Sequence, residues 1–304
     1  MRLTIFRADM LLLIAAAIWG AGFTAQRAAM DSMGPFMFTG IRFAIGTLIL
    51  LPLLPISSKL IQGGHPKTPM RGIYLIGALL TGLICLIGSM LQQVGLVYTD
   101  AGIAGFITGL YVMFVPILGL FIRYKVNMVT WVGATLAVIG LYFLSVYGFK
   151  SINPGDWFVL GCAVVWAIQV LMVGWLAPRI DPIQLAVVQF GFTAVLAIVI
   201  AVIIEGVDIN GILAATVPLL YAGILSIGVA FTLQIIAQQK SPPAHAAILL
   251  SLEAVFAAIF GALILDETFT GLQIFGCTLM LLGIIVAQLR PPRGFIPENA
   301  RSSS

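Results

Sequence analysis

Residues 9–19 read DMLLLIAAAIW, and residues 156–166 read DWFVLGCAVVW. Both stretches begin with aspartate, end with tryptophan and are mostly apolar between, and they lie 147 residues apart. Further pairs at the same shift are Pro35 with Pro182, Phe43 with Phe190, and Tyr74 with Tyr221. A shift that holds over long segments indicates an internal duplication of the chain.

The register of the duplication changes slightly further along. Leu91–Gln92 corresponds to Leu233–Gln234 at a shift of 142 residues. The glycines that correspond at a shift of 143 are Gly133 with Gly276, and Gly140 with Gly283. We therefore interpret residues 1–150 and 151–290 as two repeats, followed by a disordered tail over 291–304.

The composition indicates a helical membrane protein. Hydrophobic residues make up 61% of the 304 residues and charged residues only 9%, whereas a soluble domain is about one-quarter charged. The apolar segments are continuous, which excludes the alternating pattern of a membrane β-barrel. The lipid bilayer is the first partner that the chain requires.

Hydropathy predicts ten membrane spans of about 20 residues each. Their ranges are 9–30, 34–55, 72–97, 101–122, 128–148, 155–177, 182–204, 216–238, 243–265 and 269–289. A polar loop over 56–71 separates the second span from the third. A cleaved secretory signal is the alternative interpretation of the first span, but its removal would leave the first repeat one helix short.

The positive-inside rule places both termini in the cytoplasm. With this orientation, 12 of the 15 basic residues lie on the inner side. Because the charge is spread over several short loops, we expect no nucleic-acid partner. Each repeat has five spans, so the second must enter the membrane from the opposite side. Inverted repeats are the typical architecture of transporters that work by alternating access.

Enzymatic and metal-binding chemistry is not expected. The three cysteines, Cys85, Cys162 and Cys277, are far apart and lie inside predicted spans, and the chain has two histidines. No Ser–His pair, His-Glu-x-x-His motif or paired intramembrane aspartates occur. We predict no catalytic residue, no metal and no cofactor.

Ionisable residues inside the spans are costly and indicate function. Glu253 lies in the middle of the ninth span, and its counterpart in the first repeat is Tyr111. A carboxyl group there could exchange protons or pair with a cationic substrate, or it could be structural and bond a neighbouring helix or Arg42. Arg42 lies deep in the second span, with Gln189 as its counterpart, and could bind a substrate carboxylate or act as a structural hydrogen-bond centre.

Amide and aromatic side chains complete the candidate cavity. Ser89, Gln92 and Gln93 share one face of the third span, and Gln234 and Gln238 share one face of the eighth. Trp19, Phe23 and Gln26 line one face of the first span, and Trp166 and Gln169 occupy the matching part of the sixth. Such residues suit amino acids or organic cations, although hydrogen bonding between helices is the alternative interpretation.

Glycines seven residues apart mark the faces of the last helix of each repeat. These are Gly133 and Gly140 in the fifth span, and Gly276 and Gly283 in the tenth. Small residues allow close helix packing in membranes. We expect packing seams at these faces, which could also serve a homodimer.

The chain resembles the EamA family of the drug/metabolite transporter superfamily over residues 9–289. The residues that carry the resemblance are Trp19–Gly20, Pro35, Arg42–Phe43, Gln93, Gly95–Leu96, Val115–Pro116, Pro243, residues 250–256 (LSLEAVF), Gly261, Asp266–Glu267, Gln273, Gly276 and Gly283. The resemblance implies ten helices, a bacterial inner-membrane location, and export or exchange of small metabolites. It does not imply a substrate.

Three departures from the family pattern are informative. Ala254 stands where proline is usual, Asp266 where glycine is usual, and Tyr124–Lys125 where a glutamate often occurs. Without the proline we expect a straighter ninth span, whereas Pro116 remains a gate candidate in the fourth.

Two transport hypotheses follow. The first is export or exchange of amino-acid-like metabolites, and the second is proton-coupled efflux of lipophilic cations through Glu253. An exchanger of phosphorylated metabolites would need several cavity cations, and only Arg42 lies deep in a span. A membrane scaffold or sensor without transport is the remaining alternative.

Overall fold

The computed structural model describes residues 4–57, 70–99, 101–122, 124, 126–145, 153–265 and 270–289. All regular structure in these ranges is helical, which confirms the predicted all-α class. The predicted polar loop over 56–71 lies largely outside the described residues, and the predicted tail over 291–304 lies outside them entirely. Lys125 and Asp266 also lie outside them.

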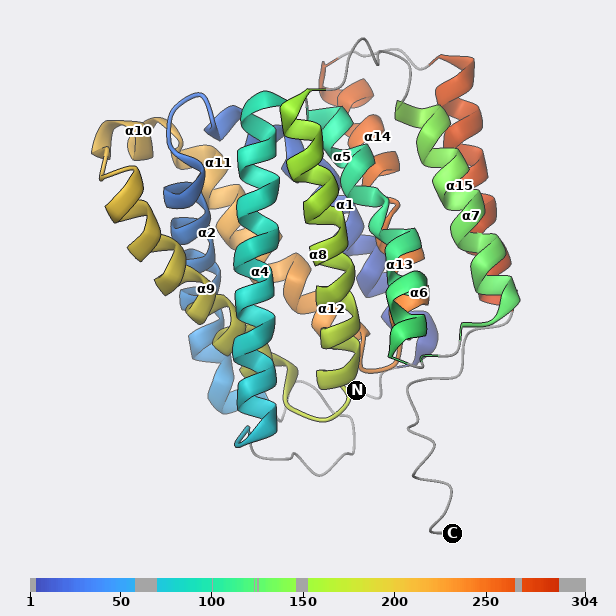
Figure 1. The fold of residues 1–304 in the computed structure, drawn as a ribbon, viewed down its shortest axis with the longest axis horizontal. Helices are drawn as coiled ribbons and strands as arrows, with labels where there is room; N and C mark the ends of the chain where they lie inside the picture. The colour runs from blue at the N-terminus through green and yellow to red at the C-terminus, as the bar shows by residue number, and fades with distance from the viewer. Residues whose placement is uncertain are drawn as a thin grey trace.

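The helices follow the predicted order of spans (Figure 1). Those of the first repeat are α1 (Ile5–Ala29), α2 (Pro35–Leu50), η1 (Leu51–Ile56), α4 (Ile73–Tyr98), α5 (Ala101–Gly109), α6 (Tyr111–Phe121) and α7 (Met128–Ser145). Those of the second are α8 (Pro154–Leu176), α9 (Pro182–Ile204), α10 (Ile209–Ala214), α11 (Thr216–Leu220), η2 (Tyr221–Phe231), α12 (Thr232–Ala237), α13 (Pro243–Leu250), α14 (Glu253–Leu265) and α15 (Gly271–Leu289).

Local sequence explains where several of these helices begin. Proline opens α2, α8, α9 and α13, because it has the right φ angle and lacks the N–H group that would be unpaired in a first turn. Asp181 precedes α9 and accepts hydrogen bonds from the backbone N–H groups of Ile183 (2.9 Å) and Gln184 (3.2 Å). The segment η2, inside the eighth span, is π-helical.

Ten apolar segments occur at the predicted positions. Seven are long and apolar enough to cross a membrane, and the shorter ones within the described residues are Met128–Phe143, Pro243–Ala257 and Gly271–Val286. The predicted ten-helix membrane fold is therefore confirmed.

The fourth and ninth spans are each interrupted. In the fourth, α5 gives way to α6 at Leu110, and in the ninth, α13 gives way to α14 at Ser251 and Leu252. Leu110 and Leu252 are 142 residues apart, which is the shift of the duplication in this region. The two interruptions therefore lie at corresponding positions of the two repeats.

The expectation that Ala254 leaves the ninth span straighter is wrong, because the helix stops without a proline. The Ser251 hydroxyl donates a hydrogen bond to the carbonyl of Ile248 at 2.8 Å. The serine hydroxyl thus bonds a carbonyl oxygen that, in a continuous helix, would accept from a backbone N–H group. In the fourth span the interruption is at Leu110, whereas Pro116 lies buried inside α6.

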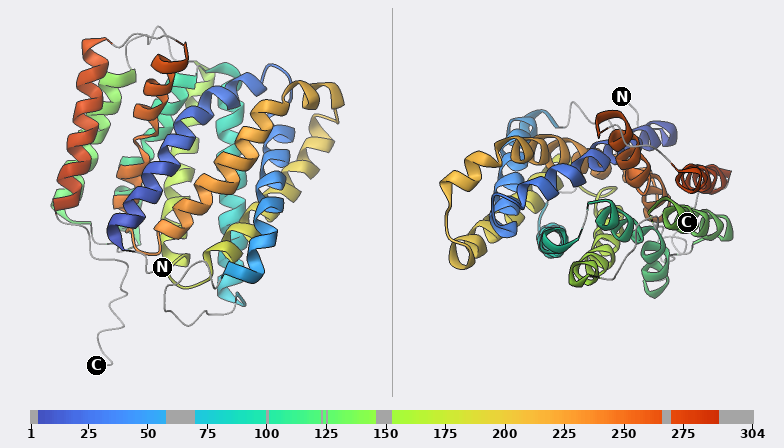
Figure 2. Two further views of the ribbon diagram at one scale, coloured as in Figure 1. Left: turned by 180° about the vertical axis from the view of Figure 1, so that it is seen from behind. Right: turned by 90° about the horizontal axis from the view of Figure 1, so that it is seen from above.

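The two repeats interlock instead of forming separate bodies. α2 packs against α9, α4 against α8, and α7 against α15, and each pair takes one helix from each repeat. Both views in Figure 2 show α7 and α15 side by side at one edge of the bundle. This arrangement agrees with the inverted repeat that the odd number of spans predicts.

The glycines of the fifth and tenth spans form the predicted seam. A side-chain carbon at Gly140 would lie 2.6 Å from the carbonyl oxygen of Gly276, and one at Gly283 would lie 2.7 Å from that of Gly133. The backbones of α7 and α15 therefore touch. Since the seam lies within one chain, it gives no support to a homodimer through these faces.

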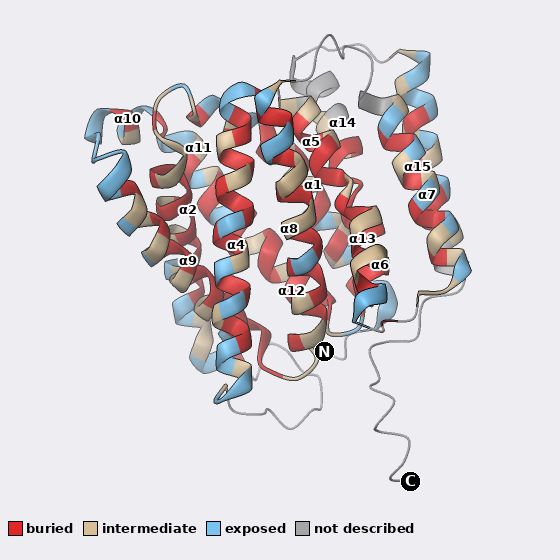
Figure 3. Ribbon diagram, in the orientation of Figure 1, coloured by how far each residue is buried: buried red, intermediate tan, exposed pale blue. Residues whose placement is uncertain are grey.

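Exposed residues lie mainly on the outward faces of the bundle (Figure 3). Many of them are large and apolar, for example Ile203 and Val217, as lipid contact requires. α1 begins and α15 ends at the same end of the bundle (Figure 1). Because the sequence predicts a cytoplasmic N-terminus, we call this end the predicted cytoplasmic end.

Candidate functional site

A cavity lies between the two helix interruptions. It holds about 550 Å³ of space not filled by atoms, its opening included. The residues that line it are Trp19, Phe23, Gln26, Arg42, Ser89, Gln92, Thr108, Tyr111, Trp166, Gln169, Val170, Ser226, Phe231, Gln234, Leu250 and Glu253. Each repeat contributes eight of these residues, as expected for a site on their pseudo-two-fold axis.

The interruptions bring the two repeat-related residues Tyr111 and Glu253 to the cavity. Tyr111 is the first residue of α6, and Glu253 is the first residue of α14. Both are buried, and neither the Tyr111 hydroxyl nor Glu253 Oε1 has a hydrogen-bond partner within the described part of the chain. Broken helices at the membrane midplane, in corresponding positions of both halves, are a typical setting for substrate sites.

One cation and one carboxyl group share this cavity. Arg42 is 3% exposed, and its Nη1 donates a hydrogen bond to Gln26 Oε1. Its Nε has no partner among the described residues. Arg42 and Glu253 do not form an ion pair with each other in the described structure. Each therefore keeps a polar atom available to a bound molecule.

Amide side chains connect the helices around the cavity. Trp166 Nε1 donates to Gln92 Oε1 at 3.2 Å, which links α8 to α4. Gln234 Nε2 donates to Gln169 Oε1 at 3.0 Å and to Gln238 Oε1 at 3.1 Å. Gln169 Nε2 and Gln234 Oε1 have no hydrogen-bond partner within the described ranges. The network thus both binds helices together and presents donors and acceptors to the cavity.

Phe231 is the centre of an aromatic cluster on one wall. Its ring centroid is 4.7 Å from that of Trp19 and 5.5 Å from that of Trp166. Trp19 Nε1 donates to the carbonyl of Ser226 at 3.3 Å, inside the π-helical segment η2. This wall offers flat apolar surface, and its tryptophans bring a polar edge as well.

The structure brings together most, but not all, of the residues that the sequence predicts for this site. The predicted residues that line the cavity are Trp19, Phe23, Gln26, Arg42, Ser89, Gln92, Tyr111, Trp166, Gln169, Gln234 and Glu253. Gln93 does not line it and instead contacts Met30 Sδ at 3.5 Å. Gln238 also lies behind the wall, where it donates to the carbonyl of Val170 at 2.9 Å.

Sequence reasoning missed Thr108, Val170, Ser226, Phe231 and Leu250. The register of the duplication could have found two of them, because Phe231 corresponds to the candidate Ser89 at a shift of 142, and Val170 to the candidate Phe23 at a shift of 147. Thr108 and Leu250 correspond to each other at a shift of 142, but neither was a candidate, and Ser226 has no candidate counterpart.

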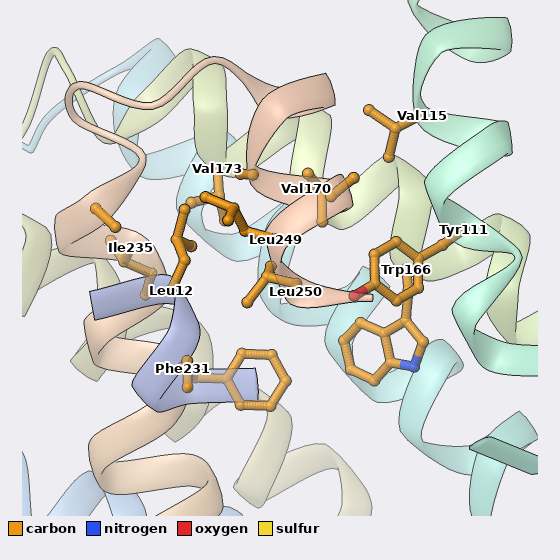
Figure 4. Packing of buried hydrophobic residues seen from close by; sticks show 14 of the residues in the cluster. Leu12, Tyr111, Val115, Trp166, Val170, Val173, Phe231, Ile235, Leu249 and Leu250 are labelled. Atoms are coloured by element: carbon orange, nitrogen blue, oxygen red, sulfur yellow. The ribbon is translucent and has the colours of Figure 1, made fainter. Parts of the chain in front are cut away.

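Buried apolar side chains lie between the cavity and the predicted cytoplasmic end. Leu12 on α1, Val173 on α8 and Leu249 on α13 each lie further toward that end than the cavity residues of their own helices. All three are buried, with 0 to 1% exposure. Figure 4 shows them gathered beside Ile235, on the opposite side of Leu250 and Phe231 from Trp166. We call these three residues the apolar plug.

Comparisons with known proteins agree with this architecture. The EamA-like transporter family matches residues 6–146 and, a second time, residues 153–288. A crystal structure at 18% sequence identity superposes with a TM-score of 0.73 over 98% of this chain and 99% of the other. At that identity the likeness shows the fold alone.

Several curated relatives are similar over most of the chain. An uncharacterized transporter of Archaeoglobus fulgidus is 34% identical over 285 residues, which cover 93% of this chain and 86% of the relative. A chloroplastic WAT1-related protein of Arabidopsis thaliana is 27% identical over 88% of this chain and 66% of its own. The uncharacterized inner membrane transporter YedA of Escherichia coli K12 is 28% identical over 56% of each chain.

Proposed function

The chain belongs to the EamA-like transporter family, and from this premise we propose that it exports or exchanges small amino-acid-like metabolites by alternating access. Membership makes it a multi-pass integral membrane transporter, and neither an enzyme nor a scaffold or sensor without transport. We also infer a bacterial inner-membrane location, which is the location that the name of YedA gives for that relative.

This proposal rests on one observation above all, that Arg42 and Glu253 line the same cavity. An amino acid is a zwitterion, and its carboxylate and ammonium groups need a cation and an acceptor held apart from each other. Arg42 Nε and Glu253 Oε1 are both buried and without a partner among the described residues. Arginine binds carboxylates with well-defined geometry, and Glu253 can accept from an ammonium group.

The remaining cavity wall suits the rest of such a molecule. Trp19, Trp166 and Phe231 offer apolar surface for a side chain, and the amides of Gln92 and Gln169 offer hydrogen bonds beside it. A phosphorylated metabolite fits less well, because Arg42 is the one Lys or Arg residue among those that line the cavity.

One observation also supports the second hypothesis, proton-coupled efflux of lipophilic cations. That mechanism needs Glu253 to face the cavity, and Glu253 lines it. A carboxyl group can release a proton when it pairs with an organic cation, and the aromatic wall can contact the cation by cation–π interactions. The experiment below separates the two hypotheses.

The test is counterflow of radiolabelled compounds in proteoliposomes, with amino acids, organic cations and phosphorylated metabolites compared. For an amino-acid substrate we expect Arg42→Gln to lower uptake by about tenfold or more, because a charged hydrogen bond contributes about 1.5–3 kcal/mol. Arg27→Gln is the matched control, since Arg27 pairs with the exposed Asp31 (2.9 Å) outside the cavity, and should change uptake little.

Glu253→Gln decides between the hypotheses. The glutamine oxygen still accepts a hydrogen bond from an ammonium group, so amino-acid counterflow should survive with reduced affinity. Proton-coupled cation efflux should be lost, because glutamine carries no exchangeable charge. If no amino acid is transported and cation efflux disappears in Glu253→Gln, the first hypothesis is wrong and the second replaces it.

A further inference from the structure

A buried pair of ionisable residues lies outside the cavity, at the predicted cytoplasmic end. Asp9 is in the second turn of α1, and His245 is the third residue of α13. His245 Nε2 lies 3.0 Å from Asp9 Oδ1, and the two side chains are 2% and 10% exposed. The other ring nitrogen, Nδ1, is buried and has no partner among the residues that the structure describes. The pair joins the first repeat to the second.

A corresponding contact holds the opposite end of the bundle. Asp156, the counterpart of Asp9 at the shift of 147, is in the first turn of α8, where its Oδ1 accepts from the Thr99 hydroxyl at 2.8 Å. Thr99 lies between the third and fourth spans, and His245 lies at the start of the ninth. Each aspartate therefore ties the first helix of one repeat to the equivalent region of the other repeat, at opposite ends.

The apolar plug separates the Asp9–His245 pair from the cavity. Leu12 is three residues beyond Asp9 on α1, and Leu249 is four residues beyond His245 on α13, so each lies about one helical turn closer to the cavity. Opening the path at this end requires α1 and α13 to move apart. That movement would break the Asp9–His245 contact and separate the plug at the same time.

The elements packed against α13 are α1, α6, α7, α8 and α15, and those packed most closely against α1 are α14, η2 and α12. Among the described residues, few other charged groups lie on these elements or next to them, and Glu253 of α14 lies in the cavity. Arg7 on α1 and Lys240 before α13 are both exposed. Arg179, beyond the end of α8, lies over the ring of Trp175 at 5.1 Å. Tyr124 follows α6, and burial raises the pKa of its phenol, so it stays protonated near neutral pH.

We propose that Asp9 and His245 form a proton-binding site that latches the predicted cytoplasmic end of the transport path. This inference rests on the proposed alternating-access function and assigns its regulation to residues outside the cavity. Histidine is the side chain whose ordinary titration falls between pH 5 and 8. Protonation of the imidazole places a positive charge against the Asp9 carboxylate, so that a hydrogen bond from a neutral ring becomes an ion pair in which both partners are charged. The latch therefore tightens as the pH falls and loosens as it rises.

The plug provides a direct readout of the latch. In a chain with Cys85, Cys162 and Cys277 replaced by alanine, Val173→Cys places a thiol in the plug at a position that is fully buried in this structure. A membrane-impermeant maleimide is added to inside-out vesicles at about pH 5.5 and about pH 8. Labelling is normalised to Met128→Cys, because Met128 is 78% exposed and reports the intrinsic effect of pH on the reaction.

We expect the normalised labelling rate to rise about tenfold from the lower to the higher pH, because the contact loses the attraction between two opposite charges when the imidazole becomes neutral. His245→Gln keeps a hydrogen bond to Asp9 but does not titrate, so its rate should be the same at both pH values. His245→Ala should label quickly at both. The proposal is wrong if the pH dependence persists in His245→Gln, or if the wild-type rate does not depend on pH.

The two proposals can fail independently. Labelling is measured without substrate, so the latch can be established even if no amino acid is transported. Conversely, amino-acid counterflow that survives alongside pH-independent labelling would overturn the latch and leave the proposed function in place. Asp9→Asn serves as a second variant if His245→Ala does not fold, and it should also lower the pH dependence.

Discussion

Gly20 is the residue at which α1 comes closest to the interruption in the ninth span. A side-chain carbon there would lie 2.6 Å from the carbonyl oxygen of Glu253 and 2.8 Å from the backbone nitrogen of Ala257. Gly20→Ala should therefore destabilise the protein by about 1–3 kcal/mol, the usual cost of overpacking, and should lower the melting temperature in detergent. Gly22→Ala is the control, because its nearest neighbours are 3.7 Å away. Equal melting temperatures for the two variants would contradict the close approach.

The residues around the cavity could be predicted from sequence where burial of a polar group in a membrane is costly. Glu253, Arg42 and the glutamines stand out for that reason alone. Phe231 does not, because a phenylalanine in an apolar span is unremarkable unless the register of the duplication is used to match it to Ser89. Gln93 shows the opposite error. It shares a helix face with Gln92, yet one residue along the helix rotates its side chain toward Met30 instead of the cavity.

At the scale of the helices, α9 supplies the cap of α2. Glu205, which ends α9, accepts hydrogen bonds from the backbone N–H groups of Phe36 (2.9 Å) and Met37 (2.8 Å). A side chain at Gly34 would occupy the space of this carboxylate. Because a cap with a negative charge stabilises a helix N-terminus, Glu205→Ala should cost about 1–2 kcal/mol of stability.

The measurement is the melting temperature of the purified protein, and Asp31→Asn is the matched control. Asp31 is an exposed carboxylate in the turn that follows α1, and it pairs with Arg27, four residues earlier in the last turn of that helix. Such surface pairs contribute about 0.5 kcal/mol or less. If Asp31→Asn lowers the melting temperature as much as Glu205→Ala does, the loss of stability in Glu205→Ala does not come from the helix cap.

The positions of the helices could be predicted from sequence, but the interruption inside the ninth span could not. Runs of about 20 apolar residues identify spans because the bilayer leaves no alternative for the backbone. An interruption inside a span depends on what surrounds it. In the ninth span the Ser251 hydroxyl pairs a carbonyl, and Gly20 leaves room for the turn. Reasoning from Ala254 alone could not include either contribution, since both come from the folded arrangement.

The whole molecule has two repeat-related aspartates that act at opposite ends, and only one of them has a titratable partner. Val159 on α8 and Leu96 on α4 are fully buried between the Asp156–Thr99 contact and the cavity, as the apolar plug is at the other end. Alternating access requires the two ends to open in turn. The Asp156–Thr99 contact should therefore act as a latch that does not respond to pH near neutrality.

The Asp156–Thr99 contact, at the end opposite the predicted cytoplasmic end, can be tested by labelling from the other side of the membrane. Thr99→Val keeps the shape of the side chain but removes the hydroxyl that donates to Asp156. In right-side-out vesicles, it should raise maleimide labelling of Val159→Cys several-fold, at both about pH 5.5 and about pH 8. Labelling of Val173→Cys from inside-out vesicles should not rise, because weakening one latch favours opening at that end alone. If Thr99→Val increased labelling at both ends together, the contact would be a general packing interaction, and the inverted symmetry of the two aspartates would have no role in transport.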